Sequence, residues 1–429
     1  SLYASNYYEA SFDVTNILPT ATLRDEYVVQ TYAAKNSGAY SEFSIVATQD
    51  NTKIDITIPS TGRTLNGLSG RTYTQTLNAG EVHQMVSYYG DDLSGTYIKS
   101  RDCKPIAVYA GNIAAQVPYS SCCGDHLVEQ LMPTNYHGKK FIITSSLLRT
   151  NDRVKITASE DDCELWVNGV YSMRLSAYQS VEYELRANEV ACLETTKPAQ
   201  VFLYFTGATY GSMEEWGDPS MVMISPVEQQ IGKVTFGTFS TPITNRHFVN
   251  VITQTKDVPN MVLDNANISS RFTRLPYDTT YSYARMEINY GSHTLECEDG
   301  AFVAHVYGIG KYESYSYSVG SSAADLATYI SINGSERVLD DDAAFATCKG
   351  SQIRLDAKCN YPLASAVWQF GDGSSATGLS VNHSYNTVGY HDAKVITTLK
   401  KERCGLLGYD TASVKIFVSQ SSNVQVDGE

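Results

Sequence analysis

Long apolar runs are missing from this sequence of 429 residues, and none approaches the roughly 18 residues that a membrane span needs. The opening residues, SLYASNYYEA, contain neither a basic stretch nor an apolar core, so we expect that any secretion signal has been removed. Positive charge is scarce, since 32 Lys and Arg stand against 46 Asp and Glu, a net charge of −14. With no basic cluster to offset that charge, a nucleic-acid partner is not expected.

Known catalytic motifs are missing too. The sequence contains no G-x-S-x-G elbow, no H-E-x-x-H pair and no phosphate-binding glycine loop. Adjacent carboxylates occur at Glu214-Glu215 and in the aspartate run at residues 340–342, where a glycosidase pair or a calcium site is conceivable. Acidic residues in turns of secreted β-proteins are usually solvated, however. We therefore expect no enzyme and no cofactor, with calcium at the aspartate run as the alternative.

What the chain has in abundance is tyrosine, with 31 Tyr against 13 Phe and 3 Trp. Tyr, Thr and Val favour half-exposed pleated surfaces. Alternating apolar residues at 53–59 and 152–158 predict strands with one buried face, and the apolar run at 197–207 predicts a strand buried on both. Asn66-Gly67 and Asn168-Gly169 each predict a hairpin tip. The composition and the nine cysteines together favour a secreted all-β protein.

An internal repeat organises the first three quarters of the chain. The segments CKPIAVYAGN, TKPAQVFLYFTG and EDGAFVAHVYGIG end three successive units. We predict three β-sandwich-like modules at about residues 1–118, 119–225 and 226–320 within one region, 1–325. A further domain is expected at 326–420, followed by a tail or linker at 421–429.

The stretch YSSCCGDHLVEQLMP, residues 119–133, brings two adjacent cysteines close to Asp125 and His126. Zinc prefers four ligands in two pairs, and no second pair lies at suitable spacing. A cysteine nucleophile usually meets its histidine across a fold, so a cysteine hydrolase is the weaker alternative. The sequence favours disulfides combined with a conformational motif, and the available partners are Cys103, Cys163, Cys192 and Cys297.

A second copy of this stretch supports a structural role. GDHLVEQLMP and GDPSMVMISP share Gly-Asp at one end and Pro at the other, but the second copy has neither cysteine nor histidine. What the copies share is a turn, an apolar filling and a terminating proline. We therefore predict joints between modules, formed by Gly124, Asp125 and Pro133, and by Gly217, Asp218 and Pro226.

The segment VWQFGDGSSATGLSVNHSYNTVGYHDAKVITTL (367–399) resembles the Ig-like PKD-type β-sandwich. The resemblance implies that Trp368 fills a core and that Gly371, Asp372 and Gly373 form a tight turn. It also implies that His383 and Tyr385 brace the next loop. The family also implies a disulfide between Cys348 and Cys404, worth roughly 3–5 kcal/mol.

Residues of about 15–320 resemble the IgGFc-binding-protein N-terminal domain, on the segments LSGTYIKSRDCKPIAVYAGN, GDPSMVMISPVEQQI and AHVYGIGKYESYSYSVG. This resemblance implies an extracellular or cell-surface recognition and adhesion protein of bacteria. Its expected ligand is a host or matrix glycoprotein, immunoglobulin and mucin included, and the PKD-type domain is a spacer or docking unit. A polysaccharide-binding protein is the alternative. Tyr312, Tyr315 and Tyr317 are candidate binding aromatics, against the alternative that they pack inside the third module.

Overall fold

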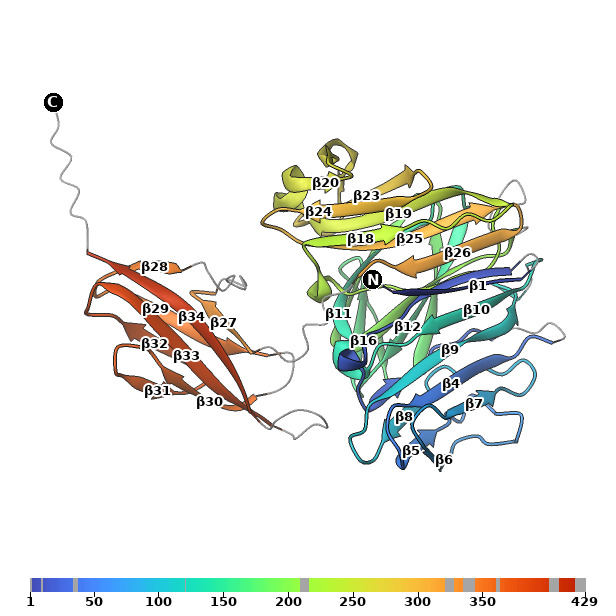
Figure 1. The fold of residues 1–429 in the computed structure, drawn as a ribbon, viewed down its shortest axis with the longest axis horizontal. Helices are drawn as coiled ribbons and strands as arrows, with labels where there is room; N and C mark the ends of the chain where they lie inside the picture. The colour runs from blue at the N-terminus through green and yellow to red at the C-terminus, as the bar shows by residue number, and fades with distance from the viewer. Residues whose placement is uncertain are drawn as a thin grey trace. The chain divides into compact units, whose positions relative to one another are not determined.

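The computed structural model describes residues 2–8, 11–33, 38–119, 121–208, 216–320, 328–334, 344–359, 363–400 and 409–420. Within these ranges the regular structure is almost all strand, and the helical elements are short 3-10 turns. The chain divides into two compact units, Ser1–Ala323 and Ala324–Glu429 (Figure 1). The predicted all-β fold is confirmed. None of the described helices is long and apolar enough to cross a membrane.

The first module of unit 1 (module 1, residues 26–130) contains two four-stranded sheets, in the orders β10-β9-β4-β7 and β3-β8-β5-β6. Alternation explains how the two sheets pack: along β4 every second side chain is buried, and Ile54 and Ile56 of β5 are fully buried in the same core. The strands are β3 (Glu26–Val28), β4 (Ser41–Ala47), β5 (Thr52–Thr57), β6 (Thr72–Leu77), β7 (Val82–Val86), β8 (Tyr97–Ser100), β9 (Ile106–Ala115) and β10 (Asp125–Gln130).

Module 2 (residues 138–223) is organised around one long strand, β16, which pairs with β11, β12, β13 and β17. The apolar run near residue 200 is buried on both faces, as its sequence predicts. The strands are β11 (Gly138–Thr144), β12 (Asn151–Ala158), β13 (Cys163–Val167), β14 (Val170–Leu175), β15 (Ser180–Arg186), β16 (Val190–Phe205) and β17 (Met221–Met223).

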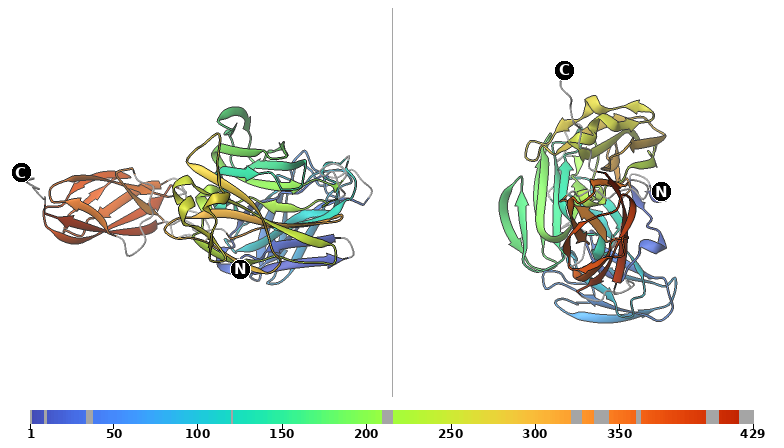
Figure 2. Two further views of the ribbon diagram at one scale, coloured as in Figure 1. Left: turned by 90° about the horizontal axis from the view of Figure 1, so that it is seen from above. Right: turned by 90° about the vertical axis from the view of Figure 1, so that its left-hand side faces the viewer.

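Module 3 (residues 233–318) again has two sheets, β18-β24-β20-β21 and β22-β23-β19-β25-β26. Figure 2 shows the three modules as blue, green and yellow bodies around one centre. The strands are β18 (Lys233–Gly237), β19 (Thr244–Gln254), β20 (Met261–Leu263), β21 (Ala266–Asn267), β22 (Thr273–Arg274), β23 (Tyr281–Ile288), β24 (Ser292–Cys297), β25 (Phe302–Gly310) and β26 (Glu313–Ser318).

Within the described residues, the remaining elements of unit 1 are an N-terminal hairpin and five 3-10 turns. The hairpin consists of β1 (Tyr3–Tyr8) and β2 (Ser11–Asn16), and β2 lies against both β10 and β26. The turns are η1 (Thr20–Thr22), η2 (Thr134–Tyr136), η3 (Val227–Gln229), η4 (Thr255–Asn260) and η5 (Ser269–Arg271).

Unit 2 is a sandwich of a three-stranded sheet, β27-β29-β32, and a five-stranded sheet, β28-β34-β33-β30-β31. Its core is built around Trp368 and Tyr385. The strands are β27 (Tyr329–Ile332), β28 (Phe345–Cys348), β29 (Gln352–Lys358), β30 (Leu363–Gln369), β31 (Ser375–Thr377), β32 (Ser380–Ser384), β33 (Gly389–Leu399) and β34 (Tyr409–Ser419).

The two predicted hairpin tips have different outcomes. Asn168 and Gly169 have φ values of 53° and 78° and join β13 directly to β14, as a two-residue turn requires. Asn66-Gly67 also lies between two paired antiparallel strands, but the predicted two-residue turn is wrong, because these residues lie inside the long loop 58–71 that joins β5 to β6. There Gly67 donates its N–H to the carbonyl of Thr64 in a local turn.

Candidate functional site

The two copies of the Gly-Asp motif meet at the centre of unit 1. Strand β10 pairs with β9 of module 1, so this module extends beyond the predicted limit at residue 118, while β17 pairs with β16 of module 2. Asp125 and Asp218 form a side-chain hydrogen bond to each other although their sheets belong to different modules. Their exposures are 4% and 3%, so solvent barely reaches this pair.

A third copy of the motif, missed in the sequence, lies at the N-terminus. Ser11 precedes Pro19 by the same spacing that separates Asp125 from Pro133 and Asp218 from Pro226. Each of the three prolines is the N-cap of a 3-10 turn, η1, η2 or η3. The Ser11 side chain also hydrogen-bonds to Asp125. The shared spacing to proline was the sequence signal that could have revealed this copy.

Burial controls the protonation of these carboxyls. It raises the pKa of Asp125 to about 7, with a smaller contribution from the negative charge of Asp13. Burial also raises the pKa of Asp218, and the neighbouring Asp125 raises it further. One proton shared between two carboxyls is a common acid–base arrangement. Because neither carboxyl is accessible to a substrate, this pair instead holds β10 and the segment before β17 together.

His126 projects from the same strand to a different partner. Its Nδ1 lies 2.6 Å from Oδ2 of Asp13 on β2, and its Nε2 lies 4.0 Å from Glu42 on β4. The hydrogen bond to Asp13 raises the pKa of His126, while burial raises the pKa of Asp13. The histidine therefore ties the N-terminal hairpin to module 1 by a charge-assisted hydrogen bond.

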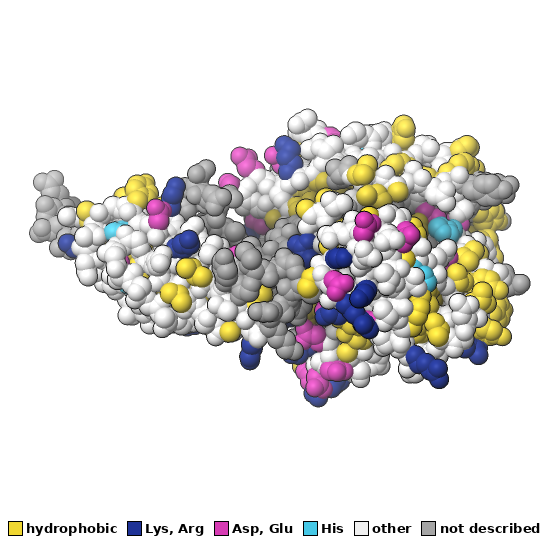
Figure 3. All heavy atoms as spheres, turned by 60° about the horizontal axis from the view of Figure 1, so that its bottom comes forward, with side chains coloured by type: hydrophobic (Ala, Val, Ile, Leu, Met, Phe, Trp, Pro, Cys, Tyr) yellow, Lys and Arg dark blue, Asp and Glu magenta, His cyan; other side chains and the backbone are white. Residues whose placement is uncertain are grey.

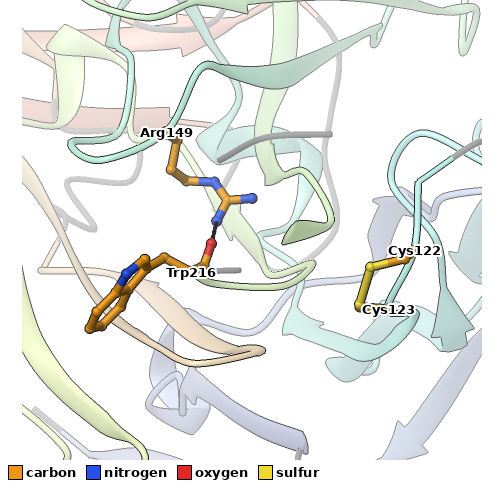
Figure 4. Close-up of a disulfide and its surroundings, with 4 residues drawn as sticks. All are labelled: Cys122, Cys123, Arg149 and Trp216. Atoms are coloured by element: carbon orange, nitrogen blue, oxygen red, sulfur yellow. Dashed lines mark hydrogen bonds between the residues drawn. A yellow bond between two sulfur atoms is a disulfide. The ribbon is translucent and has the colours of Figure 1, made fainter. Parts of the chain in front are cut away.

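A buried arginine fixes the second joint. Arg149 donates Nη1–H to the carbonyl of Trp216 at 3.2 Å and lies 3.7 Å from Asp152 (Figure 4). Gly217 has a φ of 75°, and a Cβ there would lie 2.1 Å from Arg149 Nη1. Glycine is needed at this position for both its conformation and its lack of a side chain.

Glu129 adds a further buried carboxyl beside the joint. It is 2% exposed, and its Oε1 accepts a hydrogen bond from the N–H of Met223 at 3.4 Å. Burial raises its pKa to about 8. The residue lines a cavity of about 460 Å³ together with Leu18 and Met132.

The adjacent cysteines are bonded to each other. Cys122 and Cys123 form a disulfide between neighbouring residues, with Cys123 at a φ of 66° (Figure 4). A disulfide contains no thiolate, so this pair does not supply the nucleophile that a cysteine hydrolase needs. Among the expected partners, Cys103 is also disulfide-bonded, whereas three are buried free thiols: Cys163, Cys192 and Cys297. The carbonyl of Cys122 packs against Gly207, where a Cβ would lie 2.2 Å away.

The candidate tyrosines do not form a binding surface. Tyr315 and Tyr317 are fully buried, which corrects that interpretation. The Tyr315 ring packs edge-on against Phe12 at 5.3 Å, and its hydroxyl accepts the N–H of Phe239 at 3.0 Å. Tyr312 is half-buried in the turn between β25 and β26, with a φ of 53°. On the opposite face of β26, serines contact the second joint, because Ser314 Oγ accepts the N–H of Asp218 at 3.1 Å.

The named residues of unit 2 all occupy structural positions. Trp368 is fully buried and donates its indole N–H to Gly378 at 2.9 Å. Asp372 accepts from Ser374 and lies 2.8 Å from His383, whose ring stacks on the neighbouring Phe at 3.8 Å.

The other residues of this unit follow the same plan. Gly371 and Gly373 have φ values of 77° and 90° in the turn, and the Tyr385 hydroxyl donates to the carbonyl of Phe370 at 3.0 Å. Cys348 is an exposed free cysteine, so the expected bridge is not formed at this end. Its proposed partner, Cys404, lies outside the described residues, as do Glu214-Glu215 and the aspartate run at 340–342. Within the described ranges, no group of three or more His, Cys, Asp or Glu is arranged to hold a metal ion.

Sequence reasoning missed two exposed surfaces. The first, which we call the module 1 face, is the outer side of the sheet β10-β9-β4-β7. The register places five apolar residues in neighbouring rows of this outer side: Val46, Val82, Val86, Tyr109 and Val128. Val82 is 58% exposed, and the other four are half-buried. A sheet with one solvated face normally carries polar residues there. Apolar residues at alternate positions on the outer side of these strands were the signal available in the sequence.

The second surface, which we call the hairpin shelf, is the outer side of β13 and β14 with its neighbours on β16 and β11. Trp166 and Tyr171 are opposite each other and pack edge to face at 5.6 Å, with exposures of 37% and 48%. Glu194 lies beside Trp166, and Lys140 lies beside Glu194. The predicted hairpin tip already implied the Trp166–Tyr171 pair. Figure 3 shows that hydrophobic side chains reach the surface of unit 1 in several groups.

Comparisons with known proteins agree with this architecture. A family model described as IgGFc binding protein matches residues 13–308, and a PKD domain model matches residues 338–414. No curated protein sequence matches the chain.

Similar solved structures include dimeric latent PorU from Porphyromonas gingivalis, at 10% identity and a TM-score of 0.16, covering 73% of this chain and 31% of that one. A β-D-glucuronidase from Dictyoglomus thermophilum has 8% identity and a TM-score of 0.15, covering 91% and 45%. The chain thus spans less than half the length of either, and likenesses this weak carry no argument. The family model covers more than half of the chain, and the protein therefore belongs to the IgGFc binding protein family, with a PKD domain following.

Proposed function

We propose that this protein is an extracellular recognition and adhesion protein that binds a host or matrix glycoprotein through the module 1 face. The observation that supports this most directly is that the outer side of this sheet carries four valines and a tyrosine, half-buried or exposed, where polar residues are usual. Exposed apolar patches with polar surroundings are typical of protein-binding sites. Unit 2 acts as a spacer or docking unit, and immunoglobulin and mucin are the first ligands to test, given the family.

The polar residues within the face are suited to reversible binding. Glu42 lies on the outer side of β4 and accepts a hydrogen bond from Gln84 at 2.6 Å, and Ser44 lies in the row of Tyr109. Glu42 and Ser44 both lie on β4, an inner strand of this sheet, between the apolar side chains of its neighbours, and they can be rehydrated when a partner leaves. Protein interfaces commonly combine apolar contacts with hydrogen bonds in this way.

The test is binding of the full chain to immobilised immunoglobulin and mucin by biolayer interferometry. Val82→Glu places a charge at the most exposed apolar residue of the face, on its edge strand β7, and should weaken binding about tenfold or more. Val367→Glu is the matched control, because this valine is also exposed, at 41%, but lies on β30 of unit 2. Binding to neither ligand, or binding that Val82→Glu leaves unchanged, would refute the proposal.

A further inference from the structure

The hairpin shelf presents an exposed tryptophan beside an exposed tyrosine. Trp166 is 37% exposed, whereas Trp368 is fully buried. Tyr171 packs against Trp166 edge to face, so the two rings support each other in a fixed geometry. A rigid exposed aromatic pair provides contact area at a low cost in conformational entropy.

Four side chains form one row across four strands. Tyr171 on β14 pairs with Trp166 on β13, Trp166 pairs with Glu194 on β16, and Glu194 pairs with Lys140 on β11. Directly opposite residues share a face of the sheet. Three strand spacings of about 4.8 Å give a row roughly 14 Å long. Asp278 of module 3 stands at its far end, hydrogen-bonded to Lys140.

Carboxylates outnumber cations on the shelf, since Lys140 and Arg174 stand against Glu164, Glu194 and Asp278. Lys140 lies 3.0 Å from Glu194, and Arg174 donates to Glu164 at 2.7 Å in the next row. Burial lowers the pKa of Lys140, but its hydrogen bonds to Asp278 and Glu194 outweigh this and raise it. The shelf therefore offers carboxylate acceptors and cationic donors together, with each cation already paired.

We propose that the hairpin shelf binds a neutral oligosaccharide of pyranose rings. The C–H face of a pyranose stacks on an aromatic ring, and its hydroxyls both donate and accept hydrogen bonds. An aromatic pair next to carboxylate acceptors and paired cations matches that chemistry, whereas an acidic sugar would meet the excess of carboxylates and would need an unpaired cation. A row of about 14 Å accommodates about three rings. This inference deepens the proposed function, since a glycoprotein carries such sugars, but it depends on different residues.

The test uses the full chain and free neutral oligosaccharides of hexose or N-acetylhexosamine, of increasing length. Binding is followed by tryptophan fluorescence and by isothermal titration calorimetry. We expect affinity to rise up to about three rings and then level off. Trp166→Ala should weaken binding about 10- to 100-fold and remove the fluorescence change, while Trp166→Phe should retain part of the affinity.

Two controls keep the result interpretable. Tyr390→Ala removes an aromatic ring that is 71% exposed on unit 2 and should leave sugar binding unchanged. Val82→Glu on the module 1 face should also leave it unchanged, so failure of the proposed function and failure of the shelf are distinguishable. The shelf proposal is refuted if no neutral oligosaccharide binds, or if Trp166→Ala binds such sugars as well as wild type. It is also refuted if a fully deglycosylated glycoprotein ligand still binds and Trp166→Ala weakens that binding.

Discussion

Replacing Glu129 with Gln should change how the stability of unit 1 depends on pH. Burial raises the pKa of this carboxyl from 4.5 to about 8. The folded state then keeps a proton that the unfolded state releases above pH 4.5, so the stabilisation is complete below about 4.5 and is lost as the pH rises through 8. At 1.36 kcal/mol for each pKa unit, this loss amounts to about 3 kcal/mol between pH 5 and 8.

Glu129→Gln removes the titrating group but keeps the size of the side chain. Its amide oxygen can still accept the N–H of Met223, which lies 3.4 Å from Oε1. We expect the variant to differ little from wild type at pH 5 and to be more stable at pH 8, by roughly 2–3 kcal/mol. For a unit of this size, that difference corresponds to a rise in Tm of several degrees.

Urea unfolding at pH 5, 6, 7 and 8 measures this effect, and the transition of unit 2 serves as an internal reference. Glu296→Gln is the matched control, because that side chain is 42% exposed and pairs with Lys233 at the surface. Asp125 has a raised pKa with the same sign, so wild type and variant should both lose some stability at high pH. The reasoning is refuted if Glu129→Gln and wild type lose stability in parallel from pH 5 to 8.

Three further experiments test separate parts of the structure. Gly217→Ala should lower the free energy of unfolding by about 2–3 kcal/mol, through backbone strain and a clash with the buried guanidinium of Arg149. Gly169→Ala, which has open space at a similar φ, should lower it by about 1 kcal/mol. Urea titration compares the two variants. Trp368→Ala should destabilise unit 2 by about 3–5 kcal/mol and leave the transition of unit 1 in place, as calorimetry would show; a shift in both transitions would contradict independent units. Cys122 and Cys123 should resist alkylation until a reductant is added, and mass spectrometry of the peptide that contains both would disprove the bond if either reacts first.

Much of the fold follows from local patterns. Alternation in the segment that becomes β5 and the apolar run of β16 already indicated strands with one and two buried faces. Asn168-Gly169 specified a two-residue turn, because both residues accept positive φ. The two-residue turn predicted at Asn66-Gly67 is not formed, because a dipeptide that permits a turn does not determine where the next strand begins.

The candidate sites were less accessible to sequence reasoning. Tyr315 and Tyr317 alternate as on a strand, but the β1-β2 hairpin and the segment after β18 cover them with aromatic rings, and that cover comes from distant parts of the chain. Trp166 looks no different in sequence from a buried tryptophan. Its exposure follows from its position on the face of β13 that points away from the core, opposite to that of the buried Leu165.

The sequence by itself determined the β-rich modules, the joint motif that ends in proline, and the PKD domain, because turns and alternating faces depend on residues close together in the chain. Only the tertiary structure decided that Asp125 and Asp218 share a hydrogen bond, that Cys122 bonds to its neighbour, and which aromatic rings reach solvent. These outcomes depend on how whole modules pack around one centre. Packing between modules buries one face of a strand and leaves another open to solvent. Local sequence patterns do not specify which distant segment packs against a given face.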